Sequence, residues 1–275
     1  MMQWQYLPYR ISPYLFEIKG FGIRYYSLMY LVAFIVIYLL LQYRLKNENF
    51  TIKKNLLDDF IIWAAVGVMA GGRIGYVLFY DFPYYRLHPA KIFMPFDFSN
   101  GFTFTGISGM SYHGGLMGVA VAVYFFCRKN NISIWEFSDF ICPAIPLGYT
   151  FGRLGNFFNG ELYGRVTSMP WGMYFPSDPT HRLRHPSQLY EALFEGIVLF
   201  CILWSIRKNR RFRNLMFSLY LAGYGIMRFM IEFVRKPDEQ LNFVWHEFTM
   251  GQILCSAMIL AGILIFFMGR KRQIS

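Results

Sequence analysis

Long apolar blocks, each about as long as a membrane is thick, dominate this sequence. A bilayer core of about 30 Å requires roughly 20 apolar residues per helix. Seven blocks meet this requirement: residues 25–43, 60–80, 109–127, 137–157, 187–206, 215–234 and 247–269. Gly114, Gly115, Pro143 and Pro146 interrupt the third and fourth blocks, which membrane helices tolerate where neighbours satisfy the freed backbone groups. With 55% hydrophobic and only 16% charged residues, the sequence predicts an all-α, polytopic integral membrane protein with about seven transmembrane helices.

The basic residues indicate which way the helices run. A dense set occupies short segments between the blocks and the C-terminal tail: Arg44, Lys46, Lys53, Lys54, Arg128, Lys129, Arg207, Lys208, Arg210, Arg211, Arg213, Arg270, Lys271 and Arg272. The positive-inside rule puts this set in the cytoplasm. The N-terminus and the longer loops then face outward and the C-terminus faces the cytoplasm, which requires an odd number of spans. The basic residues behind the net charge of +11 lie mainly on one predicted side of the membrane and are not gathered on a soluble face. The charge therefore does not indicate a nucleic-acid partner.

The remaining segments are too short for a second domain. We therefore expect residues 1–275 to form a single membrane-embedded domain, with the outer-face loops 81–108 and 158–186 covering its site. The first residues lack a basic region followed by an apolar one, so we expect no cleaved signal peptide. The four cysteines lie in or at the ends of apolar blocks without CxxC spacing, which favours buried structural thiols over disulfides, metal ligands or a nucleophile.

Three arginines lie inside the predicted spans, where a charge costs about 2.5–3.5 kcal/mol even on the insertion scale. Arg73, Arg153 and Arg228 all lie on helices that run from inside to outside. At 1.5 Å per residue, each lies about 20–24 Å above the inner end of its span. All three are thus expected in the outer half of the membrane.

Other polar residues are expected at the same depth. His113 lies near the outer start of the third span, and His185 precedes the fifth. The two i, i+4 pairs that follow each share a helix face; they are Glu191 with Glu195, and Arg228 with Glu232. Asn156, Asn159 and Glu161 follow Arg153 within about two turns. The sequence therefore predicts a one-sided polar cavity that opens toward the outer leaflet.

Guanidinium groups in such a cavity suit a phosphate, because their fork matches phosphate oxygens and their charge is permanent. In an outer leaflet the abundant phosphate belongs to phospholipid headgroups, so we expect a lipid substrate that enters sideways. The set of Arg, His and Glu without a metal-binding cluster predicts acid/base and electrostatic catalysis with no metal and no cofactor. Alternatively, the arginines snorkel or neutralise the glutamates and only fix helix packing.

These residues resemble a known family. The segment "GRLGNFFNGELYG", residues 152–164, is similar to the signature Gly-Arg-x-Gly-Asn-Phe-x-Asn-x-Glu-x-x-Gly of bacterial prolipoprotein diacylglyceryl transferases. The resemblance extends to "SYHGGLMG", "RHPSQLYEALFEG", "RFMIEFVRKPD" and "FTMGQILC", in the family's order and across nearly the whole chain. It implies a bacterial inner-membrane enzyme with seven helices and an active site toward the periplasm. Such enzymes move the diacylglyceryl group of phosphatidylglycerol onto the lipobox cysteine of a prelipoprotein signal peptide and release glycerol phosphate.

The resemblance also implies roles for individual residues. Arg153 would bind the phospholipid headgroup, and His113 and Arg228 would be catalytic. The substrate site would be shaped by Asn156, Asn159, Glu161, Gly164, Tyr26 and Glu232. Arg73 and His185 are added to the substrate-binding set because of their depth and placement.

Some alternatives stay open. The substrate thiol, with an ordinary pKa near 8.5, needs a base or a positive field; His113 is the nearest candidate by chemistry, and the glutamates are the alternative. His113 could instead orient Tyr112 or the lipid. A lipid or anion transporter would also hold a basic cavity, but it predicts polar residues through the full thickness and an inverted repeat. A scaffold that only binds anionic lipid would not need a histidine and several carboxylates beside the arginines.

Overall fold

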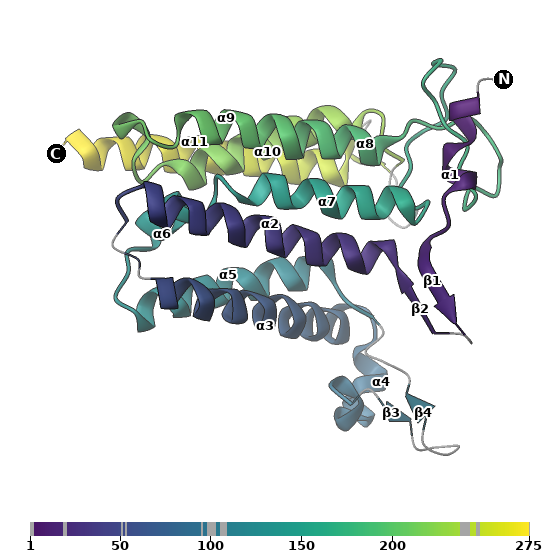
Figure 1. The fold of residues 1–275 in the computed structure, drawn as a ribbon, viewed down its shortest axis with the longest axis horizontal. Helices are drawn as coiled ribbons and strands as arrows, with labels where there is room; N and C mark the ends of the chain where they lie inside the picture. Colours follow the sequence, from purple (N-terminus) through teal and green to yellow (C-terminus); the bar gives the residue numbers. More distant parts are fainter. Residues whose placement is uncertain are drawn as a thin grey trace. The chain divides into compact units, whose positions relative to one another are not determined.

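The chain is mostly helical in the computed structural model (Figure 1). The structure describes residues 3–18, 21–50, 52, 54–94, 96–97, 103–104, 109–236, 243–245 and 248–274. In this part of the chain, four helices are long and apolar enough to cross a membrane: Tyr25–Asn47, Asn55–Phe79, Ser187–Ile206 and Met250–Lys271. The prediction of a helical membrane protein is therefore confirmed in its coarse form, while seven spans and their orientation stay a prediction.

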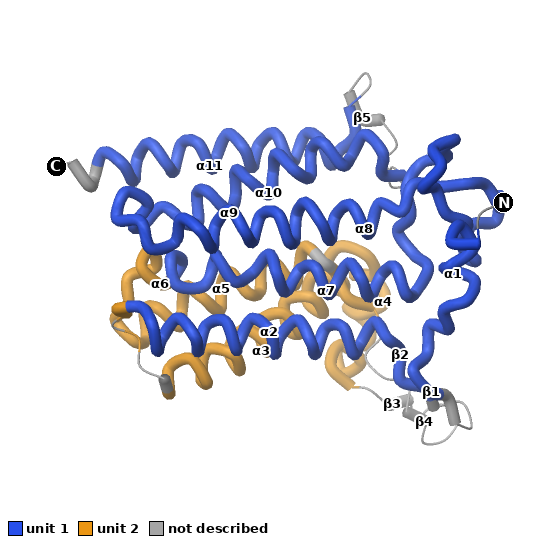
Figure 2. Tube along the Cα trace, turned by 45° about the horizontal axis from the view of Figure 1, so that its top comes forward, with its two compact units in different colours: residues 1–48, 138–275 blue, residues 49–137 orange. Residues whose placement is uncertain are grey.

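The helices gather into two compact units (Figure 2). Unit 1 combines Met1–Glu48 with Ser138–Ser275, and unit 2 is Asn49–Phe137. Helix α6 (Ile134–Ile141) begins in unit 2 and ends in unit 1.

Unit 2 is built on two long helices. Its elements are α3 (Lys54–Phe79), α4 (Phe82–Leu87), η2 (Pro89–Ile92), β3 (Phe96–Asp97), β4 (Thr103–Phe104) and α5 (Tyr112–Lys129). Strands β3 and β4 pair antiparallel. The expected third block, 109–127, becomes helical only at Tyr112, because Ser111 caps the helix by accepting a hydrogen bond from the Gly114 amide at 3.2 Å. Of the expected outer loop 81–108, residues 95, 98–102 and 105–108 lie outside the described residues.

Helices α3 and α5 approach each other through glycines. The contact surface consists of Gly67, Gly71 and Gly75 on α3 and Gly114 and Gly118 on α5. A Cβ atom at Gly118 would overlap the Gly67 carbonyl oxygen and lie 2.8 Å from the Gly71 Cα. Small residues at every fourth position let membrane helices bring their backbones together, since side-chain burial gives little driving force in lipid. The glycine spacing therefore holds unit 2 together.

Gly118→Ala is expected to destabilise the protein by about 2 kcal/mol, because the added methyl group forces two backbones apart. The measurement is the unfolding midpoint of the purified protein in detergent. Gly115→Ala is the matched control on the same helix, since its nearest neighbour would be the Val68 carbonyl oxygen at an ordinary 3.5 Å. Equal midpoints for the two variants would contradict this account of the helix pair.

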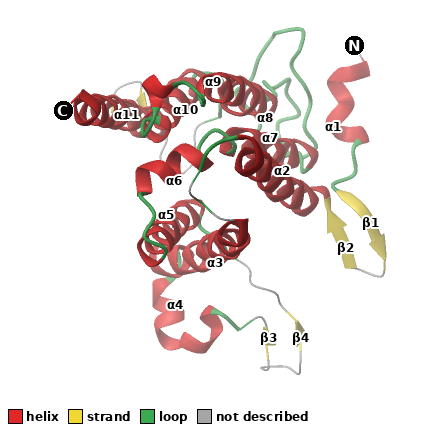
Figure 3. Ribbon diagram, turned by 60° about the vertical axis from the view of Figure 1, so that its left-hand side comes forward, coloured by secondary structure: helices red, strands yellow, loops and turns green. Residues whose placement is uncertain are grey.

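Unit 1 holds the other long helices (Figure 3). Its remaining elements are η1 (Gln3–Tyr6), α1 (Leu7–Arg10), β1 (Tyr14–Ile18), β2 (Phe21–Arg24), α2 (Tyr25–Asn47), α7 (Ile145–Phe158), α8 (Ser187–Glu191), η3 (Ala192–Val198), α9 (Leu199–Ile206), η4 (Arg210–Phe212), α10 (Met216–Glu232), β5 (Phe243–Trp245), β6 (Phe248–Thr249) and α11 (Met250–Ile274). Helix α7 packs between α2 and the helix formed by α8, η3 and α9, while α10 packs on α11. Strands β1 and β2 form an antiparallel hairpin that leads into α2.

Two sequence predictions about unit 1 were wrong in detail. The expected helix over residues 137–157 is two helices, because α6 ends at Ile141 and α7 begins at Ile145. Pro143 lies in the break, and Pro146 occupies the first turn of α7, where its missing amide hydrogen costs nothing. Cys201 is exposed on α9, whereas Cys127, Cys142 and Cys255 are buried as expected.

The set of basic residues that the sequence predicts to be cytoplasmic includes the buried Arg44. Helix α2 continues past the expected end of its block, so Arg44 lies in its last turn and is only 1% exposed. Arg44 donates to the carbonyl oxygens of Asp139 and Phe140 at 2.7 and 2.6 Å, and to Glu48 Oε2. Arg207 donates to the other oxygen of Glu48 at 2.8 Å. Hydrogen bonds and ion pairs therefore join the end of α2 to α6 and to Arg207, the residue after α9. Arg44 is thus not a free loop residue.

The segment 158–186 folds as a layer next to the end of α7. Met173, Phe175 and Tyr163 from this segment pack with Phe157 in one apolar cluster. Burial raises the pKa of Asp178, but hydrogen bonds from Arg184 and Thr180 outweigh burial and hold the pKa well below its usual range. The N-terminal segment joins this layer, since the Tyr174 amide donates to the Gln5 carbonyl oxygen at 2.9 Å.

Candidate active site

The site begins where α7 ends. Arg153 lies in its last two turns and donates from Nη1 to Asn156 Oδ1 at 3.1 Å, one turn further along the helix. The chain leaves the helix after Phe158 and turns back, so that Asn156 Nδ2 donates to Glu161 Oε1 at 2.8 Å. The signature segment thus forms one chain of hydrogen bonds, with the guanidinium at one end and a carboxylate at the other.

Glu191 on α8 is the centre of the charged groups. Its Oε2 atom lies 3.0 Å from Arg153 Nε. Its Oε1 atom lies 3.2 Å from Arg228 Nη1 and 3.8 Å from Arg235 Nε. One carboxylate therefore holds arginines from α7, from α10 and from the segment just after α10.

Glu195, one turn after Glu191, closes the cluster from the side of α7. Tyr149 donates its hydroxyl to Glu195 Oε2 at 2.5 Å and lies 3.4 Å from Glu191 Oε2. The Arg153 guanidinium lies over the Tyr149 ring, 4.7 Å from its centre. Arg228 reaches Glu195 at 3.7 Å. Tyr149 thus bridges the two carboxylates and supports the arginine.

Glu232 holds the arginines from the other side. It lies 3.4 Å from Arg228 and 3.9 Å from Arg235, and it accepts a hydrogen bond from the Thr249 hydroxyl at 3.1 Å. We call Arg153, Arg228, Arg235, Glu191, Glu195 and Glu232 the ion cluster.

Burial differs within the ion cluster in a way that bears on its chemistry. The side chains of Glu191 and Glu195 are 0% exposed, whereas those of Arg153, Arg228 and Arg235 are 16, 12 and 15% exposed. The carboxylates of Glu191 and Glu195 are therefore buried more deeply than the arginine side chains that they fix, and each of these arginine side chains stays partly exposed. Convergent arginines fixed in this way are chemically suited to a phosphate or another anion.

Gly164 and His185 lie next to the ion cluster and act through the backbone. The Gly164 amide donates to the His185 carbonyl oxygen at 2.8 Å, and Gly164 forms a β-bridge with Arg235. A Cβ atom at Gly164 would overlap the Val234 carbonyl oxygen, so only glycine allows this approach. Burial lowers the pKa of His185, whose Nδ1 lies 3.1 Å from the Tyr190 hydroxyl. Both residues thus help to set the position of Arg235.

Tyr26 and Asn159 lie at the edge of the signature segment. Tyr26 on α2 faces α7, since a Cβ atom at Gly155 would lie 3.4 Å from its Cα, and its hydroxyl donates to the Tyr30 hydroxyl at 3.1 Å. Asn159 follows the last residue of α7 and is partly exposed. Its backbone amide donates to the Gly155 carbonyl oxygen at 3.0 Å, whereas its side-chain amide has no hydrogen-bond partner among the described residues and can turn toward a ligand.

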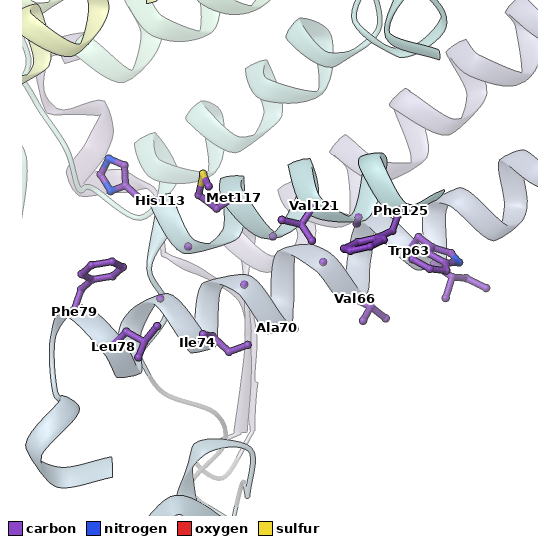
Figure 4. Close-up of a pocket in the computed structure, with 17 residues that line it drawn as sticks. Trp63, Val66, Ala70, Ile74, Leu78, Phe79, His113, Met117, Val121 and Phe125 are labelled. Atoms are coloured by element: carbon purple, nitrogen blue, oxygen red, sulfur yellow. The ribbon is translucent and has the colours of Figure 1, made fainter. Parts of the chain in front are cut away.

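Two predicted site residues belong to unit 2. His113 is exposed in the first turn of α5, at one end of an apolar groove of about 840 Å³ between α3 and α5 (Figure 4). Arg73 on α3 is 5% exposed and donates to the Ile92 and Lys91 carbonyl oxygens at 2.5 and 3.0 Å, and to the Tyr85 hydroxyl at 3.1 Å. These contacts brace the segment after α4, so the expected meeting of Arg73 with Arg153 and Arg228 stays a prediction.

Known proteins are similar to this chain over nearly its whole length. The sequence profile of the family described as prolipoprotein diacylglyceryl transferase matches residues 13–268. The chain belongs to this family. A relative from Chlorobaculum tepidum, named phosphatidylglycerol–prolipoprotein diacylglyceryl transferase, is 54% identical over 98% of this chain and 93% of its own length. Relatives of the same name from Ectopseudomonas mendocina and Campylobacter lari are 44 and 42% identical, over 97 and 96% of both chains.

Within this diacylglyceryl transferase, sequence reasoning missed two members of the site. Arg235 was left out, although it follows Glu232 by three residues and so lies on the same side of the chain. Tyr149 was also left out, although it precedes Arg153 by four residues and therefore shares its helix face. Glu191 and Glu195 were noted as a pair on one face, but their place between three arginines became visible only in the structure.

Proposed function

We propose that this protein transfers the diacylglyceryl group of phosphatidylglycerol to the thiol of the lipobox cysteine of a prelipoprotein, releasing glycerol phosphate. The names of its relatives supply donor and acceptor, and the three partly exposed arginine side chains that converge on Glu191 carry the assignment. In the proposed topology the chain crosses the bacterial inner membrane seven times, with its N-terminus and active site on the periplasmic side and its C-terminus in the cytoplasm.

The reaction breaks one carbon–oxygen bond and forms one carbon–sulfur bond. The cysteine sulfur attacks the glyceryl carbon that bears the phosphate, and the bond from this carbon to the phosphate oxygen breaks. The electron pair leaves with glycerol phosphate, while the thiol proton passes to a base. The two demands on the protein are stabilisation of charge on the leaving phosphate and deprotonation of the thiol.

The arginines meet the first demand. Arg153, Arg228 and Arg235 are fixed by Glu191 before substrate arrives, so little reorganisation is needed as charge develops. Asn156 and Glu161 orient Arg153. Glu232 orients Arg228. The side-chain amide of Asn159 is available to the headgroup. We assign Gly164 and His185 to the placement of Arg235, and Tyr26 to the edge of the lipid site.

The outer segments control how the two substrates meet. The layer formed by residues 158–186 and the N-terminal segment lies directly after α7, whose end carries the signature residues. We propose that this layer, together with loop 81–108, covers the site and admits the signal peptide beside the lipid.

A reconstituted assay tests the proposed function. The purified protein in detergent is mixed with phosphatidylglycerol and a synthetic lipobox peptide, and the mass of the peptide and the release of glycerol phosphate are measured. We expect a peptide mass increase equal to the diacylglyceryl group, and no increase when serine replaces the peptide cysteine. If the protein binds phosphatidylglycerol but never modifies the peptide, a lipid or anion transporter becomes the better interpretation.

His113→Gln is expected to lower kcat about 100- to 1,000-fold while leaving phosphatidylglycerol binding unchanged, because we assign His113 as the base that takes the thiol proton. Glutamine keeps hydrogen-bonding capacity but cannot accept that proton. His181→Gln is the control, since His181 lies in the outer layer and pairs with Tyr9. A His113→Gln variant with kcat within threefold of the wild type would move the base to the glutamates.

A further inference from the structure

Helix α7 and the helix that carries Glu191 and Glu195 are in close contact at Thr150 and Gly196. Thr150 is 5% exposed, and its hydroxyl oxygen lies 3.3 Å from the Ala192 carbonyl oxygen across the helix contact. It lies at the same distance from the Pro146 carbonyl oxygen of its own helix. A Cβ atom at Gly196 would overlap the Thr150 hydroxyl oxygen and lie 3.0 Å from the Thr150 Cβ. The threonine thus occupies the space that a side chain at 196 would need.

This contact lies in an unusual stretch of helix. Residues Ala192–Val198 form a π-helix, in which the amide of a residue bonds to the carbonyl five positions earlier, as Leu199 does to Phe194. π-helical turns are rare and wider than α-helical turns. The wide turn, together with the absence of a side chain at Gly196, leaves room for Thr150. The Thr150 hydroxyl donates to the Ala192 carbonyl oxygen in that same turn. The π segment and the threonine therefore fit each other.

Thr150 and Gly196 lie close in sequence to the residues that connect α7 with Glu191 and Glu195. Thr150 follows Tyr149, which donates to Glu195, and Gly196 follows Glu195. Thr150 also lies three residues before Arg153, which pairs with Glu191 at 3.0 Å. A change in helix separation at this contact would therefore move Arg153 relative to Glu191 and Tyr149 relative to Glu195.

We propose that Thr150 and Gly196 are positioning residues, which lock α7 to the π segment and so set the geometry of the ion cluster. Neither residue touches the reacting atoms, because both are buried between helices. Their effect on transfer rests on the proposed function, since it acts through Arg153 and Glu191.

The first test is Gly196→Ala in the detergent assay with phosphatidylglycerol and the lipobox peptide. The methyl group must push α7 away by roughly 1 Å, and a displacement of that size can cost about 100-fold in rate. We expect kcat to fall about 100-fold while KM for the lipid changes less than threefold. Gly262→Ala is the control for crowding alone, because a Cβ atom there would lie 2.8 Å from the Ala222 amide nitrogen, on the contact of α10 with α11. It is expected to keep kcat per folded molecule.

The second test uses variants of Thr150 and remains informative if Gly196→Ala does not fold. Thr150→Ala, which loses the hydroxyl, is expected to lower kcat about tenfold, and Thr150→Ser to retain it. The double variant Thr150→Ala with Gly196→Ala removes the overlapping oxygen, so its kcat is expected to return about tenfold toward the wild type. The proposal is overturned if Gly196→Ala keeps kcat within threefold, if the double variant does not recover, or if Gly262→Ala loses as much. A wild-type protein that modifies no peptide would instead refute the proposed function.

Discussion

Arg153→Ala is expected to lower kcat/KM for diacylglyceryl transfer about 1,000-fold, which corresponds to about 4 kcal/mol of lost transition-state stabilisation. Arg153 stands at the junction of the signature segment with the ion cluster, bonded to Asn156 and paired with Glu191. Alanine removes the donor group that, in the proposed function, faces the leaving phosphate. It also leaves the buried carboxylate of Glu191 with one partner fewer, so the remaining arginines lose part of their support.

Two further variants show whether charge or geometry matters at this position. Arg153→Lys keeps the charge but loses the planar fork, and we expect it to recover only part of the activity. Arg182→Ala, at an exposed position in the outer layer, is the control for loss of a positive charge. The measurement is the initial rate of peptide modification over a range of phosphatidylglycerol concentrations. If Arg153→Ala retains as much activity as Arg182→Ala, the phosphate does not bind at Arg153.

The positions of the helices could be predicted from the sequence because a segment that crosses a bilayer needs a long apolar block and must satisfy its backbone hydrogen bonds as a helix. Every predicted block is helical over most of its described residues, and α2 and α11 extend beyond their blocks by a few polar residues. The break between α6 and α7 was not predicted, because Pro143 and Pro146 are compatible with either a kinked helix or two helices. The π segment was not predicted either, and its contact partner Thr150 comes from another helix that is distant in sequence.

The site was predictable where its residues are close in sequence. Arg153 and Asn156 are one turn apart on α7, and the turn after Phe158 brings Glu161, five positions later, back to Asn156. Arg235 was missed because its partners, Glu191 and Gly164, come from distant segments. Arg153 and Arg228, which the sequence places at one depth, both pair with Glu191, but depth says nothing about which side of a helix faces inward. For this reason depth alone could not show what Arg73 contacts.

The balance of charge in the ion cluster explains how so many ionised groups are tolerated among apolar helices. Three arginines and three glutamates offset one another, which lowers the cost of burying each of them. The glutamates are also buried more deeply than the arginines. In the proposed function, a phosphate would therefore meet the arginine side chains, while the ion pairs with the glutamates keep these side chains from turning away.

Glu191→Gln is expected to impair both folding and transfer more than any other carboxylate substitution in this protein. The Glu191 side chain is 0% exposed and pairs with three arginines at 3.0, 3.2 and 3.8 Å. Glutamine has a similar shape but no charge, so three guanidinium groups would be left around a neutral amide. Removing one partner of a buried ion pair costs about 3–5 kcal/mol. We therefore expect a lower unfolding midpoint and about a 1,000-fold loss of kcat per folded molecule.

Glu232→Gln provides the matched comparison, since Glu232 is also buried but pairs with only two arginines, at 3.4 and 3.9 Å. Its loss of stability should be smaller. A double variant, Glu191→Gln with Arg235→Gln, removes one positive charge together with the negative one, so the unfolding midpoint should partly recover while transfer does not. Unfolding midpoints in detergent and rates per folded molecule separate the two effects. If Glu191→Gln is no less stable than Glu232→Gln, Glu191 is not the group that holds the arginines together.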